Sequence, residues 1–94
     1  MYEAKRSPAF ERDVKKCARK HRDLKALKEA MLAVLNSDVE TLPAKYNDHA
    51  LTGNLQGYRE LHVDGRKSDW LVLYSVDGCC VEFVRTGSHD DIFR

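Results

Sequence analysis

Histidines from well-separated parts of the sequence are the side chains with the greatest capacity for chemistry in this chain. His49 lies in a stretch without periodicity. His62 lies in a stretch that alternates as a β-strand does, and His89 follows shortly after a second predicted strand. Imidazole is the side chain that most readily exchanges protons near neutral pH. Cleavage of a phosphodiester needs a proton acceptor, a proton donor and a cation that holds the phosphate, and Arg85 can supply the cation. The residue types therefore predict acid–base cleavage of a phosphodiester.

Further polar residues lie close to these histidines in the sequence. Glu60 and His62 are two residues apart in an alternating stretch, so their side chains emerge on one face of a strand, about 6–7 Å apart. Asp69 can act as a base or orient a neighbouring group, and the adjacent Trp70 can stack a nucleic-acid base or close the core. A polar strand face without any site is the alternative interpretation of Glu60 and His62.

A metal centre is the competing chemistry for the same histidines. Three histidines with carboxylates can bind zinc, but no histidine pair shows the helical i, i+4 spacing, and no Cys-x-x-Cys pair occurs. The cysteines are three in number, Cys17, Cys79 and Cys80, and an odd count favours free thiols in a reducing compartment. No glycine-rich phosphate loop is present. The sequence therefore predicts a site without metal or cofactor.

Composition predicts one globular domain spanning residues 1–94. The chain has 94 residues, of which 43% are hydrophobic and 33% charged. It contains no apolar run of the roughly 18 residues that suggest a membrane span, and no leader pattern, which favours a cytoplasmic protein without membrane association. Residues 1–30 carry ten Lys/Arg and five Asp/Glu, a net +5. This basic region is either a solvated helix face or a footprint for an acidic partner or nucleic acid.

The periodicities predict a strand, two helices, a long loop and three more strands. These elements are Tyr2–Arg6, a helix from Ser7-Pro8 to about Lys20, a helix from Asp23 to Leu35, the loop Val39–Gly57, and the strands Tyr58–Val63, Asp69–Val76 and Cys79–Thr86. Asp77-Gly78 is a two-residue hairpin signal. The order β-α-α-β-β-β predicts an α+β fold with two helices packed on a small, mainly antiparallel four-stranded sheet, followed by a short C-terminal tail or helical turn.

Several separated motifs, in their order along the chain, resemble the YafQ-like branch of the RelE/ParE toxin superfamily. The segments that carry the resemblance are Phe10–Val14 with the basic helix, Leu42–His49, Leu51–His62, Asp69–Tyr74, and Arg85–His89 with Phe93. One departure is the five-residue segment Asp64–Ser68, where shorter relatives have a tighter turn. Its cations either extend an RNA or ribosome surface or only lengthen a solvated hairpin.

The resemblance implies a function and a set of site residues. It implies a RelE-like microbial ribonuclease fold that cleaves messenger RNA on the ribosome without metal, a cognate antitoxin that silences it, and a complex that binds operator DNA through the antitoxin. Carried over by position, the catalytic residues are His49, His62, Asp69 and His89, and the supporting residues are Glu60, Trp70, Arg85 and Phe93. The alternative is a binding module of the same fold that acts through protein partners without catalysis.

Roles can be assigned within this set as a hypothesis. The 2′-hydroxyl of the RNA attacks the adjacent phosphate and leaves a 2′,3′-cyclic phosphate and a 5′-hydroxyl. His89 is the candidate acid, and His49, alone or with Asp69, is the candidate base. Arg85 is expected to stabilise the charge on the phosphorane. His62, oriented by Glu60, is expected to hold the phosphate or share in proton transfer.

Overall fold

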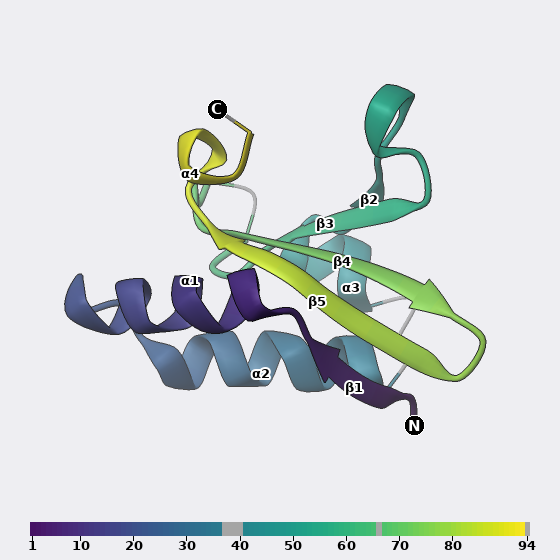
Figure 1. Ribbon diagram of the computed structural model, residues 1–94, viewed down its shortest axis with the longest axis horizontal. Helices are drawn as coiled ribbons and strands as arrows, with labels where there is room; N and C mark the ends of the chain where they lie inside the picture. Colours follow the sequence, from purple (N-terminus) through teal and green to yellow (C-terminus); the bar gives the residue numbers. More distant parts are fainter. Residues whose placement is uncertain (37–40, 66, 94) are drawn as a thin grey trace.

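A five-stranded mixed sheet forms the centre of the computed structural model, which describes residues 1–36, 41–65 and 67–93 (Figure 1). The strands lie in the order β1-β5-β4-β3-β2, with β1 parallel to β5 and the other neighbours antiparallel. Their bounds are Glu3–Arg6 (β1), His49–Ala50 (β2), Tyr58–His62 (β3), Leu71–Asp77 (β4) and Cys80–Gly87 (β5). The helices are Pro8–Arg19 (α1), Leu24–Leu35 (α2), Thr41–Tyr46 (α3) and His89–Phe93 (α4), with a 3-10 turn at Gly53–Leu55 (η1).

The predicted α+β class is confirmed, but the predicted four-stranded sheet is wrong: the described residues form a mixed sheet of five strands, and the short helices α3 and α4 accompany the two predicted ones. The additional strand is β2, in which His49 pairs with Glu60 and Ala50 with Arg59. Two residues are too few to show an alternating pattern, so this strand gave no signal in the sequence. It converts part of the predicted loop into one arm of a hairpin and thereby fixes the position of His49 beside β3.

Local capping explains where α1 and α2 begin. The hydroxyl of Ser7 accepts a hydrogen bond from the amide of Phe10 at 2.9 Å, and Pro8 occupies the first turn, where no amide hydrogen is needed. The Ser7 hydroxyl also donates to the carbonyl of Val84 at 2.7 Å, which ties the start of α1 to β5. Asp23 caps α2 by accepting from the amide of Lys25 at 3.0 Å. Both predicted helix starts are confirmed.

The turn between the two helices depends on His21. Its φ of 60° lies in the left-handed region. The amide of His21 donates to the carbonyl of Ala18 at 3.0 Å, and the amide of Arg22 donates to that of Cys17 at 3.0 Å. This pair of bonds is the usual way in which a helix ends and reverses direction. His21 is exposed and terminates the helix rather than joining the other imidazoles.

The segment predicted as a long loop contains more regular structure than expected. Residues Thr41–Tyr46, within the predicted loop, form α3. Proline is compatible with the first turn of a helix, and Pro43 is the third residue of α3. The polar run Asn36-Ser37-Asp38 predicts the end of α2; Asn36 is its C-cap, and Ser37 and Asp38 lie outside the described residues.

The strands β4 and β5 differ from their predicted bounds in ways that affect the site. Asp77 pairs with Cys80, so the two-residue turn is Gly78–Cys79 rather than Asp77-Gly78. Tyr74 pairs with Phe83 but Leu73 pairs with Arg85, because a bulge interrupts the register. The regular alternation of a β-strand therefore does not continue through the bulge. Beyond it, Thr86 is buried and Arg85 is partly exposed.

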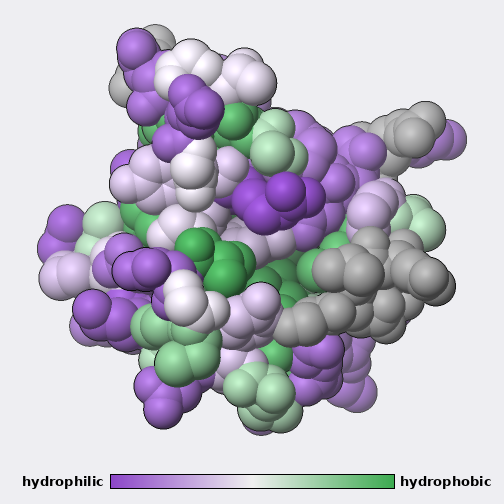
Figure 2. Space-filling view, turned by 90° about the vertical axis from the view of Figure 1, so that its right-hand side faces the viewer, coloured by the Kyte–Doolittle hydropathy of each residue, from purple (hydrophilic) through white to green (hydrophobic). Residues whose placement is uncertain are grey.

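The core lies between the sheet and the helices α1 and α2, which cover one side of it (Figure 1). Its largest fully buried side chains include Trp70, Tyr74, Phe10 and Phe83. Figure 2 shows the face at the N-terminus and the β4–β5 turn, where apolar residues lie among polar ones. Within the described ranges, no helix combines the length and apolar character needed to cross a membrane.

Candidate active site

Three adjacent strands bring most of the predicted site residues to one end of the sheet. His62 pairs with Leu71, and Leu71 pairs with Gly87, so β3, β4 and β5 are aligned at this end. Two strand spacings separate His62 from Gly87, roughly 10 Å. Both α4 and the hairpin that carries β2 rise from the side of the sheet opposite α1 and α2 (Figure 1). Most of the predicted site residues thus come from β3 and from segments that rise on the open side of the sheet.

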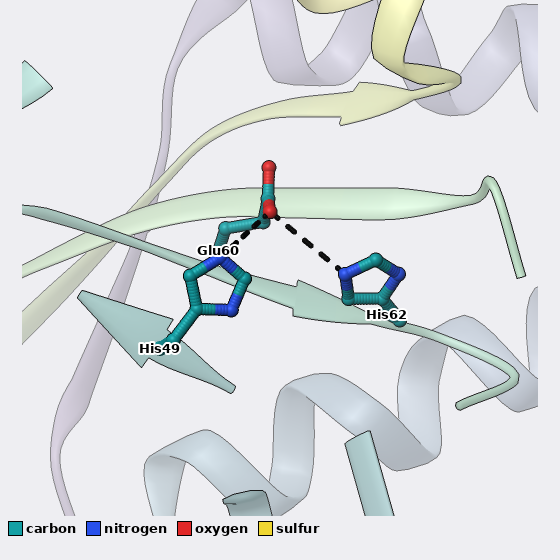
Figure 3. A group of neighbouring side chains, drawn as sticks. All are labelled: His49, Glu60 and His62. Atoms are coloured by element: carbon teal, nitrogen blue, oxygen red, sulfur yellow. Dashed lines mark ion pairs between the residues drawn. The ribbon is translucent and has the colours of Figure 1, made fainter. Parts of the chain in front are cut away.

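Two imidazoles flank one carboxylate on this side (Figure 3). Nε2 of His49 lies 3.0 Å from Oε2 of Glu60, and Nε2 of His62 lies 3.8 Å from the same oxygen. The His49 side chain is 46% exposed, whereas those of His62 and Glu60 are 16% and 10% exposed. The sequence placed Glu60 beside His62, and the structure places it closer still to His49.

Backbone carbonyls fix the tautomers of both rings. Nδ1 of His49 lies 2.9 Å from the carbonyl oxygen of Asn47, and Nδ1 of His62 lies 2.9 Å from that of Ser68. A carbonyl oxygen only accepts hydrogen bonds, so each Nδ1 must carry a hydrogen. Nε2 of each ring is therefore the nitrogen that faces the carboxylate of Glu60.

The same three side chains have the chemistry of a metal-ligand set. One ligand atom from each of His49, Glu60 and His62 lies within 4.8 Å of the others. Each imidazole donates its other ring hydrogen to a backbone carbonyl, which is the usual support for a histidine ligand. Two imidazole nitrogens and a carboxylate oxygen suit zinc or a similar transition metal. The residues therefore fit a metal ion, although the sequence showed no ligand spacing.

His89 and Asp69 meet at the start of α4. The amide of His89 donates to Oδ1 of Asp69 at 3.2 Å, and the ring of His89 lies 4.8 Å from that of Phe93, centroid to centroid. His89 is exposed, so its ring is open to a ligand. The structure places Asp69 beside the backbone of His89, whereas the sequence also left open a role for Asp69 with His49.

A capping box holds α4 in place. The amide of Ser88 donates to the carboxylate of Asp91 at 3.0 Å, and the amide of Asp91 donates to the hydroxyl of Ser88 at 3.1 Å. These bonds to Ser88 lower the pKa of Asp91. Gly87 has a φ of +151°, and a Cβ at this position would lie 3.1 Å from the side chain of Asp91. Gly87 therefore permits the close approach that sets the direction of α4.

Arg85 is held by a carboxylate that the sequence analysis did not identify. Its Nε donates to Oδ2 of Asp13 at 2.6 Å and its Nη2 donates to Oδ1 at 3.2 Å. These hydrogen bonds to Asp13 raise the pKa of Arg85, which stays cationic. Nη2 also donates to the carbonyl of Asp91 in α4 at 3.3 Å. A signal for Asp13 existed, because it lies on the apolar stripe of α1, three residues after Phe10 and four before Cys17.

Trp70 belongs to the core and not to an exposed surface. The residue is 2% exposed, and its indole nitrogen donates to the hydroxyl of Thr86 at 3.0 Å. The guanidinium of Arg22 lies 5.1 Å from its ring centroid. A buried indole cannot stack against an incoming base, so Trp70 supports the site only by fixing β4 against β5.

A buried network that the sequence analysis missed anchors the strand of His49. The Asp48 side chain is 1% exposed and accepts hydrogen bonds from the hydroxyl of Tyr74 and, at 3.0 Å, from Nε of Arg59. Burial and the hydrogen bond to Asp48 raise the pKa of Tyr74, which stays protonated and donates. Because Asp48 immediately precedes β2, this network fixes the backbone that presents His49.

The family match covers almost the whole chain. The family model described as the bacterial toxin of type II toxin-antitoxin systems, YafQ, matches residues 2–94. The chain belongs to this family. The resemblance drawn from the separated sequence motifs is thereby confirmed.

Known relatives agree with this assignment over nearly their full lengths. The mRNA interferase toxin YafQ of Escherichia coli K12 is 37% identical over 87 residues, which cover 93% of this chain and 90% of that protein. The fold is similar to YafQ in the crystal structure of the E. coli DinJ-YafQ complex, with a TM-score of 0.85, 34% identity and full coverage of both chains. It is also similar to a metal-bound toxin from Helicobacter pylori, with a TM-score of 0.86, 32% identity and coverage of 99% and 100%.

Proposed function

We propose that this YafQ-family protein is a cytoplasmic endoribonuclease of one domain that cleaves messenger RNA on the ribosome and is neutralised by a cognate antitoxin. The observation that carries the proposal is the cluster of His49, Glu60 and His62 on the side of the sheet from which α4 presents His89. The name of the E. coli relative, an mRNA interferase, supports the substrate class. Operator binding by the toxin–antitoxin complex, through the antitoxin, is part of the same proposal.

In the proposed reaction, His49 is the base. It removes the proton of the 2′-hydroxyl as that oxygen attacks phosphorus, and Glu60 stabilises the resulting imidazolium across their 3.0 Å contact. A carboxylate that orients and stabilises a catalytic imidazole is a recurrent arrangement in enzymes. Nε2 of His62 lies 3.8 Å from the same carboxylate oxygen, and in this reaction His62 faces the phosphate beside His49.

The leaving group is the 5′-oxygen, which departs with the electron pair of its bond to phosphorus. His89 donates a proton to it, so the products are a 2′,3′-cyclic phosphate and a 5′-hydroxyl. Asp69 positions His89 through its backbone amide, and the ring of Phe93 offers a surface on which a base can stack. Arg85, which Asp13 holds at the base of α4, provides positive charge for the phosphorane.

The alternative is a binding module of the same fold that acts only through partners. Such a module has no need for tautomers fixed so that two imidazoles face one carboxylate. The arrangement of His49, Glu60 and His62 therefore favours catalysis.

The chemistry of the cleaved ends tests the proposal. Purified protein is incubated with ribosomes that carry a defined messenger RNA, and the ends of the fragments are mapped. We expect cleavage only on the ribosome, with 5′-hydroxyl and 2′,3′-cyclic phosphate ends. Fragments with 5′-phosphate ends would require attack by water, and absence of cleavage would favour the binding module.

A further inference from the structure

The connection between β3 and β4 contains the five-residue segment Asp64–Ser68, where the chain departs from shorter relatives. The reaction proposed above uses none of the side chains in this segment. The segment begins two residues after His62 and ends immediately before Asp69, so both of its ends adjoin residues of the candidate site. Its described residues are therefore in a position to orient the groups that take part in the reaction.

Backbone hydrogen bonds fold this segment back onto the end of β3. The amide of Gly65 donates to the carbonyl of His62 at 3.1 Å, and the amide of Ser68 donates to the carbonyl of Gly65 at 3.0 Å. Gly65 has a φ of +91°, a conformation that glycine adopts more readily than other residues. These bonds return the chain to His62, whose Nδ1 lies 2.9 Å from the carbonyl oxygen of Ser68.

The side chain of Ser68 restrains the direction of that carbonyl. Its hydroxyl accepts a hydrogen bond from the amide of Trp70 at 3.0 Å, which closes a compact turn around the Ser68 carbonyl. Trp70 is a fixed point, because it is 2% exposed and its carbonyl accepts from the amide of Val63 at 2.9 Å. The hydroxyl thus couples the Ser68 carbonyl to the buried start of β4.

The carbonyl of Ser68 selects one of two orientations of the His62 ring. A half-turn of an imidazole exchanges each ring nitrogen with a carbon, so a turned ring would present a C–H group to the carbonyl. An N–H group makes a much stronger hydrogen bond than a C–H group does. The observed orientation directs Nε2 of His62 to within 3.8 Å of Oε2 of Glu60. The carbonyl therefore determines that a nitrogen, and not a carbon, faces the site.

We infer that Ser68 is a positioning residue for RNA cleavage, which acts through its backbone carbonyl on the ring of His62. The inference rests on the proposed function, in which His62 faces the phosphate. It gives the segment Asp64–Ser68 a role in the site that does not depend on the cations of the segment.

Three substitutions test the inference by cleavage. Ser68→Ala removes the hydroxyl and Ser68→Thr retains it. Ser75→Ala is the matched control, because Ser75 is also half-buried but lies farther along β4, where it pairs with Tyr58 and Glu82. We expect the single-turnover rate constant on ribosomes to fall roughly tenfold in Ser68→Ala, since a misoriented imidazole slows the chemical step. Half-saturation should stay unchanged, and Ser68→Thr and Ser75→Ala should cleave as the parent does.

Nuclear magnetic resonance of protein labelled with ¹⁵N-histidine reads the His62 ring directly and without ribosomes. We expect Nδ1 of His62 to carry a hydrogen in the parent and in Ser68→Thr. In Ser68→Ala the His62 signals should shift towards an average over ring orientations. The signals of His49 should not change, because the carbonyl of Asn47 holds that ring. His62→Ala identifies which signals belong to His62.

The two measurements together decide the inference. Parent-like His62 signals in folded Ser68→Ala, or a loss that Ser68→Thr does not restore, would overturn it. Weaker half-saturation at an unchanged rate constant would also overturn it, because Ser68 would then contact the RNA itself. If circular dichroism shows that Ser68→Ala does not fold, Ser68→Cys takes its place, since a thiol is a weak acceptor. If the parent does not cleave RNA, the proposed function fails, and the resonance comparison alone decides whether Ser68 orients His62.

Discussion

At the residue scale, alternation along a single strand predicts which residue shares a face with Glu60, but not that His49 contacts its carboxylate from another strand. Alternation correctly placed Glu60 and His62 on one face, but it carried no information on His49, which reaches Glu60 through β2. The residue types of the site were therefore visible in the sequence. Their pairing depends on a strand of two residues and on backbone carbonyls, which have no sequence signature.

Glu60→Gln tests whether the carboxylate supports proton transfer. An amide cannot stabilise an imidazolium as a carboxylate does, so we expect the cleavage rate to fall by roughly 10²-fold. Substrate binding should change little, because Glu60 is largely covered by its neighbours. Single-turnover cleavage on ribosomes separates the two effects. A variant that loses affinity but keeps its rate would show that Glu60 only shapes the surface.

His89→Ala tests the assignment of the general acid. A positioned acid contributes about 10²–10⁴-fold in rate, so we expect cleavage and growth arrest to be lost. The fold and antitoxin binding should remain, because His89 is exposed and its backbone bond to Asp69 does not need the imidazole. His21→Ala is the matched control, since it removes an exposed histidine that only ends α1. Near-parent cleavage by His89→Ala would move the acid role to His49 or His62.

At the scale of elements, the predicted and observed folds differ mainly in short elements that polar contacts hold in place. The long helices α1 and α2 carry a cap and a repeated apolar spacing, so their existence and starts followed from the sequence. In contrast, β2 and α4 are too short to show a period. Contacts from distant residues hold them, such as Asp48 with Tyr74 and Asp13 with Arg85, and such contacts are set by tertiary structure.

Asp13→Ala tests the link between α1 and β5. The substitution removes both bonds to Arg85 and the 3.1 Å bond from the amide of Thr86. We expect the free energy of unfolding to fall by about 2–3 kcal/mol, because the guanidinium and the amide lose their charged acceptor. Urea denaturation measures the loss. Glu11→Ala is the control on the same helix: its 3.5 Å pair with Arg6 is exposed, so the change should stay below about 1 kcal/mol.

The capping box of α4 predicts a pH dependence at acidic pH. The bonds from Ser88 lower the pKa of Asp91 in the folded protein, so its contribution is fully present above the ordinary carboxyl pKa of about 4. The contribution is lost as the pH falls through the lower, folded value. We expect amide exchange at Ser88 to accelerate in that range. In Asp91→Asn the exchange should already be faster at neutral pH; parent-like protection there would contradict the role of the carboxylate.

Proton chemistry and metal binding compete for the same atoms at the scale of the whole molecule. His49, Glu60 and His62 offer three ligand atoms within 4.8 Å, yet the proposed reaction uses His49 to take up a proton. A metal ion on these nitrogens would leave no lone pair for the 2′-hydroxyl proton. We therefore expect protein that has been treated with chelator and desalted to cleave ribosome-bound RNA at the parent rate. Added zinc should inhibit it, and His62→Ala should weaken zinc binding in equilibrium dialysis.

The chelator has to be removed before the assay, because it would also strip Mg²⁺ from the ribosomes. Protein that carries one tightly bound transition metal, loses cleavage with it and regains cleavage when zinc or manganese is restored would contradict the metal-free reaction. In that case the ligand set would hold the cofactor of the enzyme, and His49 would act as a ligand instead of a base. Inhibition by zinc, without any loss of cleavage after chelation, would instead show that the cluster binds metal and transfers protons at the same atoms, so that bound metal prevents proton uptake.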